Sequence, residues 1–229
     1  MTLLEIIILS AGLLPSFIWL LFYLRKDSHP ESNPLVLKIF IFGILSGVLA
    51  IFFEKFFQKG MELLKAGHFA LLIFLASAII EETVKFLAVK IGLKKTSEPD
   101  EPIDFALFMI ISALGFAALE NVLVLTSQPI ISSIRALEVM LFRFISATFL
   151  HALCSGSIGY FWVLAKRKCK PIFLWLGFLG ISCLHAFYNW SIIKIEGSSK
   201  FLIPLILITG LSLFVSFGIK HLKRLEKIC

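Results

Sequence analysis

Residues 75–90 read LASAIIEETVKFLAVK, and two adjacent carboxylates, Glu81 and Glu82, interrupt the apolar run that begins near Phe69. Lys85 follows them by about one helical turn. A charged side chain at the centre of a bilayer costs about 3 kcal/mol on insertion scales, so such residues usually face a protein interior and serve a function. The other polar residues within apolar runs are therefore candidate partners of this pair.

Composition places the chain in a membrane. It has 229 residues, of which 59% are hydrophobic, and a mean hydropathy of +0.95, whereas a soluble domain is about 45–50% apolar. A transmembrane helix needs about 20 apolar residues, and we expect one polytopic helical domain over residues 1–229. Seven runs are candidate spans: 3–24, 36–57, 69–91, 103–125, 136–165, 172–193 and 201–219. The fifth is long for a bilayer, and we expect it to tilt or project.

The basic residues predict the orientation. A net charge of +7 also suits nucleic acid, but these residues lie in short loops, where they control topology and meet anionic lipid headgroups. With the N-terminus outside, 14 of the 22 lysines and arginines are cytoplasmic and 6 lie outside, while Lys85 and Arg143 are within spans. The sequence therefore predicts an all-α membrane protein with about seven transmembrane helices, its N-terminus outside and its C-terminus cytoplasmic, and no nucleic-acid partner.

Polar residues are unevenly distributed among the spans. The first, second and last spans carry almost nothing ionisable at mid-depth. The third to sixth spans carry Glu81, Glu82, Lys85, Glu120, Asn121, Arg143, His151, His185 and Asn189. Because polar groups in a bilayer seek one another, we expect a four-helix polar core formed by spans three to six, with three more apolar helices around it.

Helical spacing separates the two adjacent carboxylates. Ser77, Glu81 and Lys85 are four residues apart and share a helix face. Glu82 is turned by about 100° from Glu81. One carboxylate can therefore face a cavity while the other bonds a neighbouring helix. The alternative is a buried Glu–Lys pair that only holds helices together.

The charge balance of the predicted core favours chemistry. The three glutamates Glu81, Glu82 and Glu120 exceed the two cations, so with neutral histidines the core needs a held proton, a protonated histidine or a bound cation. Carboxyl groups beside histidines suit general acid–base catalysis on a water molecule. They also suit a divalent metal such as zinc, for which three protein ligands and an open position are typical. The candidate metal ligands are His151, His185 and Glu120, and a metal-free mechanism remains open.

Four ordered motifs, each on its own predicted span, carry a family resemblance. They are Glu81-Glu82-xx-Lys85, Phe116-xxx-Glu120-Asn121, His151 followed by Ser155-Gly156 and Gly159, and His185-xxx-Asn189. This order resembles the PrsW family of membrane-embedded proteases, which is related to the type II CAAX prenyl endopeptidases and the CPBP abortive-infection proteins. The resemblance covers about residues 75–190. It implies an endopeptidase of a bacterial-style plasma membrane that cuts membrane-anchored proteins, with an anti-sigma factor as one expected substrate.

The resemblance also implies roles for individual residues. Glu81 corresponds to the water-activating base and Glu82 to a supporting group, while His151 and His185 correspond to histidines that position water or metal. Asn189 would stabilise the oxyanion. Supporting roles fall to Lys85, Asn121 and Arg143. Glu120 stands where CAAX-type enzymes carry histidine, which disfavours CAAX processing.

Other classes of function fit parts of the pattern. Buried glutamate and histidine chains also form proton relays, so a proton- or cation-coupled transporter is the main alternative. A haem- or quinone-binding protein would use the two histidines and leave the glutamates unexplained. A non-catalytic protein that binds a membrane-anchored partner is a further alternative.

Overall fold

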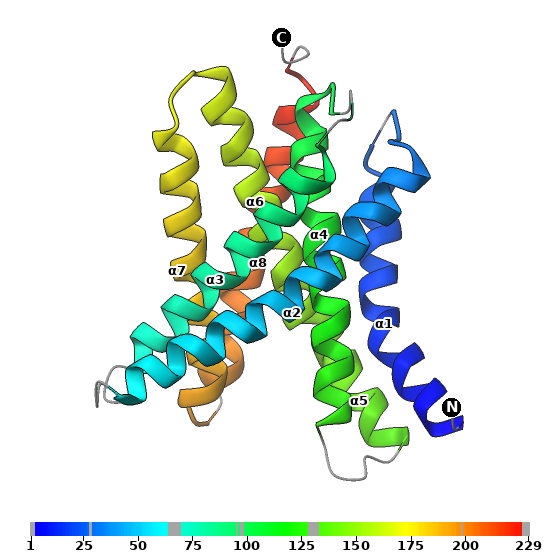
Figure 1. Ribbon diagram of the computed structural model, residues 1–229, viewed down its shortest axis with the longest axis vertical. Coiled ribbons are helices and arrows are strands. Elements are labelled where there is room, and N and C mark those ends of the chain that lie inside the picture. The colour runs from blue at the N-terminus through cyan, green and yellow to red at the C-terminus, as the bar shows by residue number, and fades with distance from the viewer. Residues whose placement is uncertain are drawn as a thin grey trace.

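The computed structural model describes residues 3–27, 29–63, 70–94, 96, 99–127, 133–197 and 199–225. Within these ranges the chain is helical and contains no strand (Figure 1). The helices are α1 (Leu3–Leu24), α2 (Asn33–Leu63), α3 (Ala70–Gly92), α4 (Pro102–Thr126), α5 (Ser133–Ile145), α6 (Ala147–Arg167), α7 (Ile172–Lys194) and α8 (Ser199–Leu222). The predicted all-α class is confirmed.

In the part of the chain that the structure describes, six segments are long and apolar enough to cross a membrane, with α5 and α6 counted as one of them. The helix outside that set, α3, has 23 residues and carries the Glu81, Glu82 and Lys85 charges. Together they make the multi-pass membrane protein predicted from the sequence. The first residue of α1 and the last of α8 lie at opposite ends of the molecule (Figure 1). The inside–outside orientation remains a prediction.

Helix α4 lies at the centre of the fold. It is apolar around its whole circumference and is buried continuously from Pro102 to Ala118, as expected of a helix covered on every side. A capping box begins it, in which Asp104 accepts a hydrogen bond from the Glu101 amide at 2.7 Å. Asp104 therefore stabilises the first turn.

Helices α2 and α4 cross at glycines. A Cβ atom added to Gly43 would lie 2.1 Å from the Ser112 carbonyl oxygen. One added to Gly115 would lie 2.1 Å from the carbonyl oxygen of Phe40. No side chain fits at either position, so the two backbones pack directly against each other.

The span predicted over residues 136–165 lies within one candidate membrane span, Ile134–Arg167, which is built from the two helices α5 and α6. The structure divides this segment at Ser146, whose φ of −118° and ψ of −94° lie outside the helical region. The Ser146 hydroxyl donates a hydrogen bond to the Phe142 carbonyl at 2.7 Å. Such back-bonding to the fourth preceding carbonyl bends helices, and here it accompanies a change of direction between α5 and α6.

Helix α2 is longer than expected from the sequence. The prediction ended this span at residue 57, whereas the helix continues to Leu63. Glu54 therefore lies inside α2 rather than at its end. Helix α3 begins at Ala70, and the predicted first residue of that span, Phe69, lies outside the described residues. Both α2 and α3 are strongly inclined to the other helices (Figure 1).

Candidate active site

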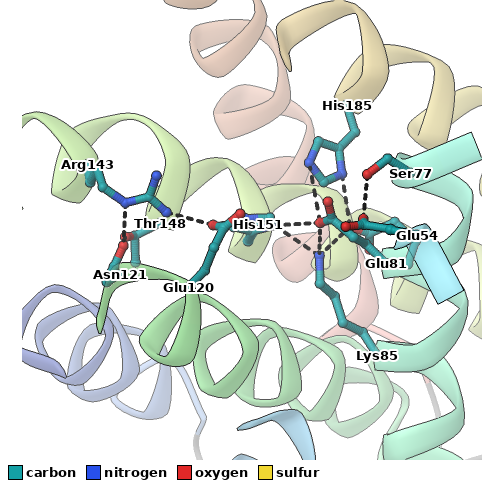
Figure 2. Close-up of polar contacts among 11 residues, drawn as sticks. Glu54, Ser77, Glu81, Lys85, Glu120, Asn121, Arg143, Thr148, His151 and His185 are labelled. Atoms are coloured by element: carbon teal, nitrogen blue, oxygen red, sulfur yellow. Dashed lines mark hydrogen bonds and ion pairs between the residues drawn. The ribbon is translucent and has the colours of Figure 1, made fainter. Parts of the chain in front are cut away.

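The Glu81-Glu82 pair lies in the middle of α3 and faces the protein interior. Glu82 and Lys85 are 0% exposed, and Glu81 is 6% exposed. The Lys85 ammonium Nζ lies 2.9 Å from Glu82 Oε1 and 3.3 Å from Glu81 Oε2 (Figure 2). The positive charge of this one lysine partly compensates the negative charges of both carboxylates. Such compensation is needed because charges buried away from water are costly unless they are paired.

Glu82 connects three helices. Besides Lys85 of α3, its carboxylate accepts a 2.6 Å hydrogen bond from the Ser155 hydroxyl of α6. Its Oε1 also lies 3.2 Å from His185 Nδ1 of α7. With both oxygens engaged and no exposed surface, this carboxylate is held in a fixed position.

Glu81 faces a small cavity instead. Together with Glu54 and Glu120 it lines a cavity of about 60 Å³ between α2, α3 and α4, which apolar side chains complete. One water molecule needs about 10–15 Å³ of such cavity space. The cavity therefore has room for water directly beside the Glu81 carboxylate. The sequence prediction that one carboxylate bonds neighbouring helices while the other faces a cavity agrees with this geometry.

Two histidines complete the centre of the cluster. His151 Nδ1 lies 2.9 Å from Lys85 Nζ, and His151 Nε2 lies 3.1 Å from Glu120 Oε2. His185 Nε2 is buried without a hydrogen-bond partner among the described residues, and it lies 3.8 Å from Glu81 Oε2. The ring centroids of the two histidines are 5.1 Å apart. A buried nitrogen without a partner is costly and marks a position that suits a ligand.

Glu120 is held by a second cation. Arg143 of α5 donates to Glu120 Oε2 and to Asn121 Oδ1, each at 2.6 Å. The Asn121 amide donates in turn to the Thr148 hydroxyl of α6 at 3.1 Å. These bonds fix the end of α4 against both halves of the broken helix, as Figure 2 shows.

The structure thus connects eight of the nine predicted site residues in one polar network: Glu81, Glu82, Lys85, Glu120, Asn121, Arg143, His151 and His185. Asn189 is separate. It lies one turn beyond His185 in α7, is half-buried, and makes no side-chain hydrogen bond with the described part of the chain. Its role as an oxyanion donor stays a prediction.

Sequence reasoning missed Glu54. This residue belongs to α2, which the sequence assigned to the apolar surroundings, yet its carboxylate accepts a hydrogen bond from the Ser77 hydroxyl of α3 and lines the same cavity as Glu81. The phenylalanines around Glu54, at positions 52, 53, 56 and 57, were the available signal. They show that the apolar helix continues past the charge.

The side chains of the buried cluster are of the types that bind divalent metal ions. Glu81, Glu82, His151 and His185 each offer one ligand atom, and these atoms lie within 4.8 Å of one another. Carboxylate oxygens and imidazole nitrogens are the ligands zinc takes in catalytic sites, and the unpartnered His185 Nε2 is available. Glu120, suggested as a ligand from the sequence, stands outside this group and pairs with Arg143. The Lys85 ammonium contacts three of the four donors, so it competes with a metal for them.

Comparisons with known proteins agree with this site. The family model described as "PrsW family intramembrane metalloprotease" matches residues 31–217. The protein named Protease PrsW of Geobacillus kaustophilus is 32% identical over 193 residues, which cover 82% of this chain and 81% of that protein. Protease PrsW of Oceanobacillus iheyensis is 30% identical over 224 residues, or 95% of each chain.

A third relative, Protease PrsW of Bacillus subtilis, is 26% identical over 201 residues, which cover 86% of this chain and 88% of that protein. No solved structure matches significantly. The family model covers most of the chain and contains α3, α6 and α7, the three helices that build the buried glutamate–histidine cluster. The chain therefore belongs to the PrsW family of intramembrane metalloproteases.

Proposed function

We propose that this membrane-embedded peptidase hydrolyses peptide bonds of membrane-anchored proteins and that Glu81 is the base that activates the attacking water. The observation that carries the proposal is the contrast between the two adjacent carboxylates. Glu82 is fully buried and engaged by Lys85, Ser155 and His185, whereas Glu81 lines a cavity with room for water. A base must reach the proton that it removes, and of this pair Glu81 is the one that faces the cavity.

The proposed reaction is the addition of water to a peptide carbonyl. Glu81 takes a proton from water as the oxygen attacks the carbonyl carbon, and the carbon–nitrogen bond then breaks. The proton passes from Glu81 to the leaving nitrogen, which departs as an amine. Asn189 is the proposed neutral donor to the oxyanion, a role that amide side chains perform in other hydrolases.

Lys85 and the histidines position the base. Lys85 Nζ lies 3.3 Å from Glu81 Oε2 and fixes one of its oxygens. His151 and His185 lie on two further helices, with ring nitrogens 3.7 and 3.8 Å from the same oxygen. Lys85 therefore holds one oxygen of Glu81, and the two histidine rings lie close beside it, which supports a role of this group in orienting a water molecule.

The proposed holders of the metal are Glu82, His151 and His185, which leaves Glu81 free to act as the base. A bound divalent ion such as zinc would supply Lewis-acid polarisation of the substrate carbonyl or a more acidic water. Among membrane-anchored substrates, an anti-sigma factor is the candidate that the family resemblance suggests.

The experiment is cleavage of a membrane-anchored reporter by the purified protein in liposomes. Glu81→Gln keeps the shape of the side chain, and we expect it to lower kcat by about 10²- to 10⁴-fold, the usual contribution of a general base. Glu62→Gln, an exposed position of α2, is the matched control and should cleave normally. Undiminished cleavage by Glu81→Gln would contradict the assignment of the base.

A further inference from the structure

We infer that Glu54 selects substrates that carry a positively charged side chain next to the bond that is cut. This inference rests on the proposed function, because it assigns a specificity role to the cavity in which Glu81 acts. Glu54 lies in α2, outside the three helices that supply the buried glutamate–histidine cluster. None of the motifs that carry the family resemblance includes it.

Position is the first argument. Glu54 is half-buried and lines the cavity of about 60 Å³ together with Glu81 and Glu120. In Figure 2 it extends the row of polar side chains beyond Glu81, at the end opposite Arg143. A substrate group that enters beside Glu81 therefore meets the Glu54 carboxylate.

Charge pairing is the second argument. Glu81 and Glu82 share Lys85, and Glu120 pairs with Arg143. Among residues 3–27, 29–63, 70–94, 96, 99–127, 133–197 and 199–225, Glu54 has no lysine or arginine within ion-pair distance, and its one hydrogen-bond partner is the neutral Ser77 hydroxyl. An ionisable side chain within a bilayer normally has a partner or lies on a substrate path. A cation brought by the substrate would be that partner.

Access is the third argument. Gly47, Ala50 and Glu54 lie at intervals of three and four residues and share one face of α2, and all three line the cavity. The two small residues let Leu119 and Phe116 of α4 pack closely against α2, since a Cβ added to Gly47 would lie 2.8 Å from Leu119 Cδ2, and they give the cavity an apolar wall beside the carboxylate. Lysine and arginine have long apolar stems that extend along apolar surface while the charged group reaches a polar site. Their side chains therefore match an apolar cavity wall that ends in a carboxylate.

A purely structural role for Glu54 is the alternative. The Ser77 hydrogen bond joins α2 to α3, and loss of that bond would loosen the helix pair. This role predicts equal effects on all substrates and similar effects of Glu54→Gln and Ser77→Ala. Selection by charge predicts that only Glu54→Gln changes the preference between substrates.

The test uses three membrane-anchored reporters that differ only in lysine, glutamine or glutamate beside the cleaved bond. The readout is the ratio of kcat/KM values for the lysine and glutamine reporters in liposomes. For the unmodified protein we expect a ratio of roughly 10 to 100, the range for a hydrogen bond to a charged group. Glu54→Gln should bring the ratio close to one, and Glu54→Lys should favour the glutamate reporter. Ser77→Ala and Glu62→Gln should retain the preference.

Equal cleavage of all three reporters by the unmodified protein would overturn the inference and leave the proposed function intact. A binding measurement covers the opposite case, in which no reporter is cut. Cross-linking of each reporter to Glu81→Gln, with and without Glu54→Gln, reports the preference without chemistry. Preferential capture of the lysine reporter, lost with Glu54→Gln, supports the inference, and equal capture contradicts it.

Discussion

Nζ of Lys85 lies 2.9 Å from Nδ1 of His151. A lysine ammonium can only donate, so Nδ1 accepts, and a neutral His151 ring must carry its proton on Nε2. That nitrogen lies 3.1 Å from Glu120 Oε2 and donates to it. The lysine therefore determines the tautomer of the histidine, and the histidine links the carboxylates of α3 to the Glu120–Arg143 pair.

The first prediction concerns Lys85. Replacement by methionine leaves the buried Glu82 without its cation, and breaking a buried pair in this way costs about 3–5 kcal/mol. We expect Lys85→Met to lower the unfolding free energy in detergent by this amount, as measured by denaturant titration. Lys90→Met, at an exposed position of the same helix, should unfold like the unmodified protein. Equal stability of the two variants would show that the ion pair between Lys85 and Glu82 does not stabilise the fold.

The second prediction concerns the hydrogen bond from Ser155 to Glu82. Ser155→Ala removes a 2.6 Å bond to a fully buried carboxylate, and leaving such a group under-satisfied costs about 1–3 kcal/mol. Ser157→Ala is the control, since that hydroxyl is equally buried but bonds only to the Leu153 carbonyl of its own helix. The difference in melting temperature between the two variants measures the effect. A larger loss at Ser157 would contradict it.

The third prediction concerns the crossing of α2 and α4. Gly115→Ala places a methyl group where the Phe40 carbonyl oxygen lies 2.1 Å away, so the helices must separate, at a cost of about 1–3 kcal/mol. Because the cavity lies between these helices, cleavage should fall as well. Gly60→Ala is the same change within α2 where nothing lies within 4 Å, and it should be neutral or slightly stabilising. Thermal unfolding and reporter cleavage together decide the prediction.

The fourth prediction concerns metal. We expect purified protein to retain a divalent ion, measured by elemental mass spectrometry, and His185→Ala to lose it, because the buried Nε2 then disappears. His29→Ala, with a largely exposed side chain in a loop, is the control. Loss of one of the ligands should weaken binding strongly, whereas the control should keep its ion. Equal metal content in the two variants would exclude the buried cluster as the site.

The helical architecture and most of the site could be predicted because a bilayer restricts what a charge can do. Charges within apolar runs must converge, so Glu81, Glu120, His151 and His185 were assigned to one cluster from their spans alone. Their individual partners could not be predicted in the same way. Whether Arg143 or Lys85 pairs with Glu120 depends on depth and helix rotation, which spacing along one helix does not give.

Two features escaped prediction for physical reasons. Glu54 was not singled out because it lies three residues before the predicted end of its span, where a charge can reach water. Only the tilt and length of α2 bring it beside Glu81. The division at Ser146 was hidden because serine is common in membrane helices and a single hydroxyl bond to Phe142 leaves no composition signal. Both depend on packing against other helices.

The narrow cavity beside Glu81 also restricts the shape of any substrate. A space of about 60 Å³ cannot admit an α-helix, whose diameter with side chains is about 10–12 Å. A membrane-anchored segment must therefore unwind locally before its carbonyl reaches the carboxylate. Unwinding in lipid exposes unsatisfied backbone groups, and it costs least where glycine or proline already weakens the helix. Susceptibility to cleavage would then depend on how readily the segment leaves the helical state, as well as on which side chains it carries.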